Sequence, residues 1–282
     1  MKIVRSARSM QKLSRSAKLA GKTVGLVPTM GFLHEGHLSL IRKARKKCEL
    51  LVVSLFVNPA QFGPDEDFSR YPRDPARDRR FCEKEKTDVL FCPKTRDVYC
   101  PDHSVFVNEN DLSGGLCGAS RPGHFRGVLT VVAKLFNIVQ PDVAVFGRKD
   151  AQQLRIIERM VRDLNFPVRI VTAPIARESD GLAISSRNVY LSGRERARAV
   201  CLRESLCLCK RMYRRGTKDT RVIKSAMKKL IENGSPRVDI DYIEAVDYAT
   251  LKPAKKIVAP TLVALAVYIG KTRLIDNTVV GE

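Results

Sequence analysis

The residues best suited to chemistry near the start of the chain are His34 and His37, two of its four histidines. They stand in the string HEGH at the expected start of a helix, so both imidazoles would lie on one face beside the free N–H groups of the first turn. This arrangement suits a phosphate anion, and Gly36 would let the backbone come close to it. A helix-capping loop with surface imidazoles is the alternative. A zinc-protease site does not fit, because HEGH lacks the i, i+4 spacing of H-E-x-x-H.

Two further segments combine polar residues with a predicted turn. In 146–153, Lys149 could hold a phosphate and Gln153 could face the ligand. Asp150 could cap a helix, or accept a hydrogen bond from a ribose or a hydrated metal. In 180–188, the hydroxyls of Ser185 and Ser186 precede Arg187, a string that could enclose phosphates. The alternatives are a solvent-exposed helix start for the first segment and a plain turn for the second.

An alternation of short apolar runs and longer amphipathic runs must position these segments. We predict strands over 22–27, 50–57, 88–91, 143–146 and 168–171, and helices over 36–48, 128–138 and 151–163. This order predicts an α/β fold, a Rossmann-like doubly wound parallel sheet with helices on both faces. Right-handed crossovers would bring the strand-to-helix loops to one edge of the sheet. The polar stretch 58–75 is too long for a simple connector and is predicted to be a functional loop.

The pattern changes after about residue 174. A long basic helix over 193–215 and a second helix over 219–233 precede predicted strands over 238–246, 261–269 and 272–275. We therefore predict two domains: a Rossmann-like domain over 1–175 and a smaller C-terminal α+β domain over 176–282.

Composition excludes several classes of protein. Hydrophobic residues make up 44% of the 282 residues, which excludes a wholly disordered chain. No apolar run approaches the ~20 residues that span a bilayer, and the N-terminus lacks the apolar core of a secretory signal. We therefore expect a cytoplasmic protein that does not enter membranes.

The net charge of +21 invites a nucleic-acid partner, but its distribution argues against one. The basic clusters are scattered over predicted helix faces, and aromatic residues are only 6% of the chain. We expect no specific nucleic-acid binding.

The eight cysteines contain no C-x-x-C pair and are expected to be reduced. No usual zinc spacing is matched by the set Cys92, Cys100, His103, Cys117 and His124.

Together the three polar segments carry a specific resemblance. An H-x-G-H motif followed by later Lys and Ser loops resembles the nucleotidyltransferase superfamily, which includes the class I aminoacyl-tRNA synthetases. More narrowly, the chain resembles the pantoate–β-alanine ligase family from about Val4 to Gly281. The strings that carry this resemblance are VPTMGFLHEGH, VSLFVNPAQFGPDEDFSRYPRD, RPGHFRGVLTVVAKLFNIVQPD, FGRKDAQQ and DGLAISSRNVYLS.

The resemblance implies a two-step reaction and a homodimer. Pantoate and ATP would form pantoyl adenylate with loss of pyrophosphate, and β-alanine would then attack the acyl carbon to give pantothenate and AMP. The domain over 1–175 would bind nucleotide and pantoate, and the domain over 176–282 would close over the active site. His37 matches the family's proton donor and would stabilise charge on the departing pyrophosphate. The positions implied for ATP are Met30, Gly31, His34, Gly36, His37, Gly147, Arg148, Lys149, Asp150, Ala176, Ile184, Ser185, Ser186 and Arg187.

The resemblance also implies positions for the other ligands. Gln61 would bind pantoate and later β-alanine, and Gln153 would hold the hydroxyls of pantoate. Nearby pocket positions are Asn58, Tyr71 and Arg121. Mg²⁺ would bridge the phosphates largely through water, with Asp78 as the nearest carboxylate. The alternative for Asp78 is a surface acid paired with a neighbouring arginine.

Three positions depart from the common family pattern. Ile184 stands where Met is frequent, Ala176 stands where Val is frequent, and Arg148 replaces a Lys, Glu or Gln. Backbone contacts at the first two would survive these changes, so we expect an active enzyme.

Two other functions remain open from the sequence. A different adenylyl- or cytidylyltransferase would keep H-x-G-H but lack the pair Gln61 and Gln153. An RNA-binding protein that reuses the fold would lose affinity steeply with salt, unlike ATP- and pantoate-dependent turnover.

Overall fold

The structure is a computed structural model that describes residues 1–64 and 66–281, so Asp65 of the predicted loop and Glu282 of the second predicted domain lie outside the described residues. The chain divides into two compact units. Unit 1 comprises 1–110, 121–148 and 153–174, and unit 2 comprises 111–120, 149–152 and 175–282. The division at 174/175 lies next to the boundary expected from the sequence. The two short segments of unit 2 that precede residue 175, 111–120 and 149–152, are not predicted by the sequence pattern.

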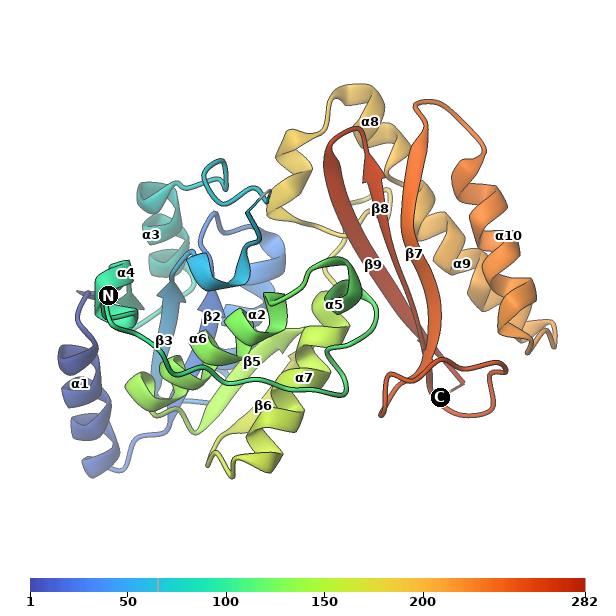
Figure 1. Cartoon of the computed structure of the whole chain (residues 1–282). Helices are drawn as coiled ribbons and strands as arrows, with labels where there is room; N and C mark the ends of the chain where they lie inside the picture. The colour runs from blue at the N-terminus through green and yellow to red at the C-terminus, as the bar shows by residue number, and fades with distance from the viewer. Residues whose placement is uncertain (65, 282) are drawn as a thin grey trace. The chain divides into compact units, whose positions relative to one another are not determined.

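Unit 1 is built on a parallel sheet with six strands among the described residues, in the order β1-β4-β3-β2-β5-β6. Figure 1 labels β2, β3, β5 and β6 of this sheet. The strands are β1 (Lys2–Val4), β2 (Val24–Thr29), β3 (Leu50–Leu55), β4 (Val89–Phe91), β5 (Val143–Gly147) and β6 (Arg169–Ala173). The predicted doubly wound parallel sheet is confirmed. The chain runs outward from β2 through β3 to β4, and then restarts beside β2 with β5 and β6. Ligands of such sheets bind at the carboxyl ends of the strands where the order reverses, which here are the ends of β2 and β5.

Helices cover this sheet because their apolar stripes match its apolar faces. They are α1 (Ala7–Leu19), α2 (Glu35–Arg45), α3 (Pro75–Lys84), α4 (Thr95–Val98), α6 (His124–Val139) and α7 (Ala151–Asp163), with the short 3₁₀ turns η1 (Pro59–Gln61) and η2 (Arg148–Asp150). Ile41 and Ala44 of α2 belong to one buried cluster with Val27 and Val53. Leu26 is equally buried, and because successive strand residues point to opposite faces, it belongs to a second apolar layer.

The sequence pattern does not predict β1 or α1 of unit 1. β1 has three residues, which is too short for an alternating pattern to stand out. α1 lies in a stretch dominated by Lys, Arg and Ser, and buries only Met10 and Ser14 fully. Such a sparse apolar stripe gives a weak helical period.

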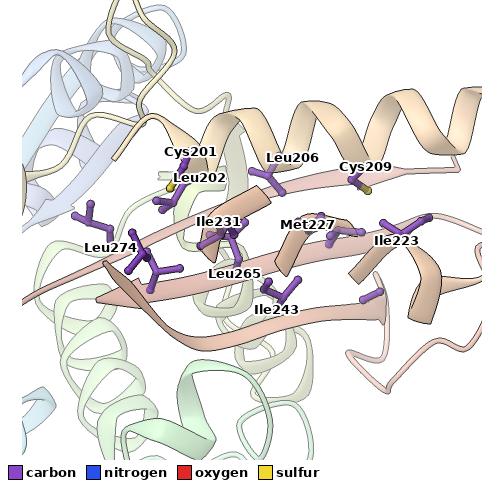
Figure 2. Close-up of a cluster of buried hydrophobic side chains, with 14 of the residues drawn as sticks. Cys201, Leu202, Leu206, Cys209, Ile223, Met227, Ile231, Ile243, Leu265 and Leu274 are labelled. Atoms are coloured by element: carbon purple, nitrogen blue, oxygen red, sulfur yellow. The ribbon is translucent and has the colours of Figure 1, made fainter. Parts of the chain in front are cut away.

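Unit 2 combines helices with an antiparallel sheet in the order β7-β8-β9. The strands are β7 (Val238–Asp247), β8 (Thr261–Ile269) and β9 (Thr272–Val280), and the helices are α5 (Cys117–Ser120), α8 (Gly193–Arg198), α9 (Cys201–Arg214) and α10 (Thr220–Glu232), with the 3₁₀ turn η3 (Ser186–Tyr190). Figure 2 shows Leu206 of α9 and Met227 of α10 in the buried cluster that these helices form with the strands, including Leu265 of β8. The predicted smaller α+β domain is confirmed.

Two predictions in this unit were wrong in detail. The helix expected over 193–215 is interrupted, because Leu202 N–H bonds to Ala199 O, a three-residue step that breaks the ladder between α8 and α9. The strand expected over 272–275 continues to Val280, paired with β8 along its whole length. The polar pair Asp276 and Asn277 breaks the apolar pattern of the strand, so the pattern predicts an end at residue 275.

Among the described residues, no helix is both long enough and apolar enough to cross a membrane.

Candidate active site

The loop between β2 and α2 is held in an unusual backbone shape. Gly31 has φ +84° and Phe32 has φ +50°, both in the left-handed region. The Thr29 hydroxyl donates to Ser54 O at 2.8 Å and accepts from Gly31 N–H at 3.2 Å. The loop is therefore fastened to the end of the neighbouring strand β3.

Asp78 of α3 is the second support of this loop. Its Oδ2 accepts from Phe32 N–H at 2.8 Å, and its Oδ1 accepts from Leu33 N–H at 2.7 Å. The residue is 2% exposed, and burial raises the pKa of its carboxyl against the opposing effect of these two bonds. The alternative of a surface acid is therefore wrong. The predicted role near a metal is not tested by this geometry.

The structure brings the two imidazoles of the HEGH string together at the start of α2. His34 is the N-cap, with an extended backbone at φ −138° and ψ 176°. Its backbone N–H donates to His37 Nδ1 at 3.4 Å, and the two rings stack with centroids 4.0 Å apart. A ring nitrogen that accepts a hydrogen bond carries no proton, so in the neutral ring of His37 the proton lies on Nε2.

Gln61 lies close to this loop, beyond the end of β3. Its Nε2 donates to Met30 Sδ at 3.2 Å, and its Oε1 accepts from Asn58 Nδ2 at 3.0 Å. Asn58 is 1% exposed and also donates to Gly127 O, while its Oδ1 accepts from the Tyr99 hydroxyl at 2.8 Å. Asn58 therefore orients the amide of Gln61.

Helix α6 approaches this segment closely at Gly127. A Cβ at Gly127 would overlap the Ala60 carbonyl and would lie 2.6 Å from Gln61 N. Only glycine permits two backbones to come this near. The position of Gln61 therefore depends on a residue that carries no side chain.

Arg121 and His124 hold the other side of Gln61. His124 is buried, and its Nδ1–H donates to Gln61 O at 2.8 Å. Its Nε2 can then accept from Arg121 NH1, which lies 3.0 Å away. Arg121 also forms a bidentate ion pair with Glu66, at 2.7 and 2.6 Å. Burial favours a higher pKa for Glu66, but the hydrogen bond and charge of Arg121 hold that pKa below its usual value.

The end of β5 carries the remaining predicted residues of unit 1. Gly147 ends the strand, and a Cβ there would lie 3.8 Å from Leu40 of α2. β5 pairs with β2, so Gly147 and Arg148 lie at the end of a strand adjacent to the one that ends before Met30. Gln153 is half-buried in the first turn of α7, and Tyr71 is buried in the predicted loop 58–75.

In unit 2, the predicted residues Lys149 and Asp150 belong to η2, which is anchored on both sides. Lys149 O accepts from Asn277 Nδ2 at 2.8 Å. Gln152 is 6% exposed, and its Nε2 donates to Leu112 O and Gly115 O while its Oε1 accepts from Cys117 N–H. The backbone around Lys149 is thus closely fixed.

The other predicted residues of unit 2 lie on a folded-back segment. Ala176 O accepts from Ile184 N–H at 3.0 Å, and Arg177 bridges Ala183. Ser185 caps η3 by accepting from Arg187 N–H at 3.3 Å, and Ser186 begins that turn. The Ala176 carbonyl is therefore engaged inside this segment.

Several residues that shape the site were not found from the sequence. Tyr99, Glu66 and Gly127 each contact or orient a predicted residue from a distant part of the chain. From the sequence, His124 is a candidate only for a zinc site. Nothing in the local sequence distinguishes these residues, since their partners are brought near by the fold.

The sequence profile of the family described as "Pantoate-beta-alanine ligase" matches residues 2–279. The chain belongs to this family. It is 54% identical to the pantothenate synthetase of Thermotoga petrophila and 55% identical to that of Thermosipho melanesiensis, each over 281 residues and 100% of both chains.

Solved structures agree with this assignment. A crystal structure of pantothenate synthetase from Thermus thermophilus matches with a TM-score of 0.92 and 43% identity, over 99% of each chain. A pantoate–β-alanine ligase from Francisella tularensis, complexed with β-γ ATP and β-alanine, matches with a TM-score of 0.81 and 32% identity, over 99% of this chain and 97% of that one. The protein is accordingly a ligase that forms the amide bond between pantoate and β-alanine, as the resemblance implied.

Proposed function

We propose that the reaction proceeds through pantoyl adenylate, with ATP bound at the carboxyl edge of the parallel sheet and His37 acting on its phosphates. A carboxylate is a poor electrophile, so its oxygen must first be converted into a good leaving group. Adenylation does this, and the protein contributes mainly positioning and charge neutralisation. The observation that carries the proposal is the bond from His34 N–H to His37 Nδ1, because it assigns the proton of the neutral ring to Nε2, the nitrogen that would donate to a phosphate oxygen.

The start of α2 supplies the rest of the anion site. The helix N-terminus carries partial positive charge, and the backbone at Gly36 has no side chain to block a phosphate. As α- and β-phosphates separate, negative charge grows on the pyrophosphate oxygens. A donor already aimed by a backbone hydrogen bond stabilises that charge without reorganising.

We propose Mg²⁺ as part of the substrate, arriving with ATP. Among residues 1–64 and 66–281, no group of three or more His, Cys, Asp or Glu could hold a resident metal ion. Asp78 uses one lone pair on each oxygen for the loop. The remaining lone pairs could accept from a water of the Mg²⁺ hydration shell, which is the outer-sphere role we assign to it.

The proposed ATP contacts in unit 2 are Lys149 with a phosphate, Asp150 with the ribose, Ala176 with adenine through its backbone, and the run 184–187 with the triphosphate. The anchored backbone of η2 and the capped start of η3 support this assignment, because fixed donors bind a polyanion without losing conformational freedom. In unit 1 we assign Met30, Gly31, His34, Gly147 and Arg148 to the same ligand.

Pantoate is assigned to Gln61, Gln153 and Arg121. The amide of Gln61 is oriented by Asn58, and one N–H of its Nε2 is donated to Met30 Sδ. We assign the second N–H of Nε2 to a hydroxyl or carboxylate of the substrate. Asn58 is almost fully buried with its polar atoms in use, so we propose that it acts through Gln61.

Replacing Gln61 with alanine is expected to raise the KM for pantoate by about tenfold, the effect of one lost hydrogen bond, and to leave the KM for ATP nearly unchanged. Steady-state kinetics with each substrate varied in turn would measure both. Gln11→Ala is the matched control, because Gln11 is an exposed glutamine of unit 1 that bonds only to Asn137 O among its described contacts. Equal losses for ATP and pantoate would contradict the assigned role.

Glu66→Gln tests the role of Arg121. Glu66 forms an ion pair with the guanidinium of Arg121, which we assign to the substrate carboxylate. Removing the competing charge of Glu66 is therefore expected to lower the KM for pantoate by about fivefold. Glu83→Gln breaks an exposed ion pair with Arg79 and serves as the control. A higher KM for pantoate in Glu66→Gln would mean that Glu66 holds Arg121 in its working position.

The test of the reaction itself is exchange of labelled pyrophosphate into ATP before β-alanine is added. We expect exchange that requires both pantoate and Mg²⁺. Exchange that depends on another carboxylate, or no exchange, would contradict the pantoyl adenylate step.

We also propose a cytoplasmic homodimer, supported by the family resemblance alone. Sedimentation equilibrium of the full chain would measure the mass, and a monomer at micromolar concentration would contradict it.

A further inference from the structure

β9 contains a run of three buried polar residues, Asp276, Asn277 and Thr278. The first two carry a carboxylate and an amide. Asp276 is 2% exposed and Asn277 is 7% exposed. A polar side chain buried in a sheet destabilises the fold unless its hydrogen bonds are made inside the protein. The side chains of these two residues bond to Arg177 and Lys149, which lie in the two segments of unit 2 that we assign to ATP.

Asp276 holds the segment that carries Ser185, Ser186 and Arg187. Its carboxylate forms a bidentate ion pair with Arg177 at 2.7 and 2.9 Å. The guanidinium of Arg177 also donates to Gly181 O at 3.0 Å, and the Arg177 backbone bridges Ala183. A bidentate pair fixes direction as well as distance. Arg177 therefore fastens residues 176–184 to β9, and this stretch leads directly into Ser185, Ser186 and Arg187.

Asn277 holds the other segment. Its Nδ2 donates to Lys149 O at 2.8 Å. Its own backbone N–H donates to Asp276 Oδ1 at 2.8 Å, so the two residues are also linked to each other. Because successive residues of a strand point to opposite faces, β9 presents one anchor on each face.

We propose that Asp276 and Asn277 are positioning residues for ATP: together they set the backbones of the 149–152 and 176–187 segments so that their donors are placed for the phosphates. This inference rests on the proposed function, since it takes the ATP contacts from there. Neither residue touches the substrate in this scheme. Preorganised donors bind a polyanion more tightly than donors that must be ordered on binding.

The test compares Asn277→Ala and Arg177→Lys with the wild type. Both variants are expected to raise the KM for ATP, and the Kd for a non-hydrolysable ATP analogue measured by calorimetry, by about tenfold. The KM for β-alanine is expected to stay within about twofold, because the loss acts through the nucleotide segments. Arg177→Lys keeps the positive charge beside Asp276 but loses the bidentate geometry.

Thr278→Val is the matched control. Thr278 adjoins Asn277 in β9 and is equally buried at 7% exposure. In the described part of the chain, its side chain bonds to neither ATP segment. This variant is expected to keep the wild-type KM for ATP, even where its melting temperature changes.

The inference is overturned where Asn277→Ala keeps the wild-type affinity for the ATP analogue, or where Thr278→Val weakens it equally. If Arg177→Lys does not fold, Asn277→Ala decides the matter alone. Failure of the proposed function would be seen in the wild-type protein, as the absence of pantoate-dependent pyrophosphate exchange. The calorimetric comparison of the variants does not depend on that reaction and still tests how the nucleotide segments are positioned.

Discussion

Replacing His37 with alanine is expected to slow pantoate-dependent pyrophosphate exchange by about 10²- to 10³-fold, the effect of removing one donor that stabilises developing charge. The Nδ1 of His37 accepts from His34 N–H, so the proton of the neutral ring lies on Nε2. Alanine removes that donor and the ring that stacks on His34. The initial rate of exchange, measured with saturating ATP and pantoate, would report the loss.

His37→Gln separates hydrogen bonding from proton transfer. Glutamine keeps an N–H donor but cannot give up a proton. Partial recovery of the exchange rate over the alanine variant would therefore assign His37 to charge stabilisation. No recovery over the alanine variant would assign it to proton transfer. A normal melting temperature and circular dichroism are expected for both variants, because His37 is only half-buried in the first turn of α2. An unchanged exchange rate in His37→Ala would remove the residue from the mechanism.

Gly127→Ala is expected to have the largest effect on stability, about 3 kcal/mol of unfolding free energy, the upper part of the usual range for overpacking. The new methyl group would overlap the backbone carbonyl of Ala60, and a Cβ, whose position is set by its own backbone, cannot rotate away from it. Either α6 or η1 must shift, and η1 carries Gln61. We therefore expect a lower melting temperature together with a raised KM for pantoate.

Gly193→Ala is the control for this substitution. A Cβ at Gly193 would meet nothing within 4 Å, so the same chemical change should leave the kinetics unaltered and should not lower the melting temperature. Thermal unfolding followed by circular dichroism, with pantoate kinetics on the same samples, would measure both variants. Equal melting temperatures for Gly127→Ala and the wild type would contradict the prediction, because they would show that α6 and η1 can move apart without loss of stability.

Much of the nucleotide side of the site could be predicted from the sequence, because its signals are local. The HEGH string follows an apolar strand and opens an amphipathic helix, so the two imidazoles had to share the first turn of α2. The alternation of strands and helices likewise predicts a parallel sheet, whose right-handed crossovers bring the strand-to-helix loops to one edge. The structure adds that β2, which ends before Met30, and β5, which ends at Gly147, are neighbours.

Tertiary structure alone decided how the side chains at that edge are held. Asp78 looked like a surface acid or a metal partner, yet it supports a left-handed loop 45 residues away in the chain. Asp276 and Asn277 concealed the second half of β9, although they anchor segments 99 and 128 residues earlier. A hydrogen bond between distant residues leaves no periodic trace in a sequence, because period and propensity describe only neighbours along the chain. The sequence by itself determined the elements and the chemistry of the HEGH loop, and the packing of those elements decided which buried polar groups hold the loop in place.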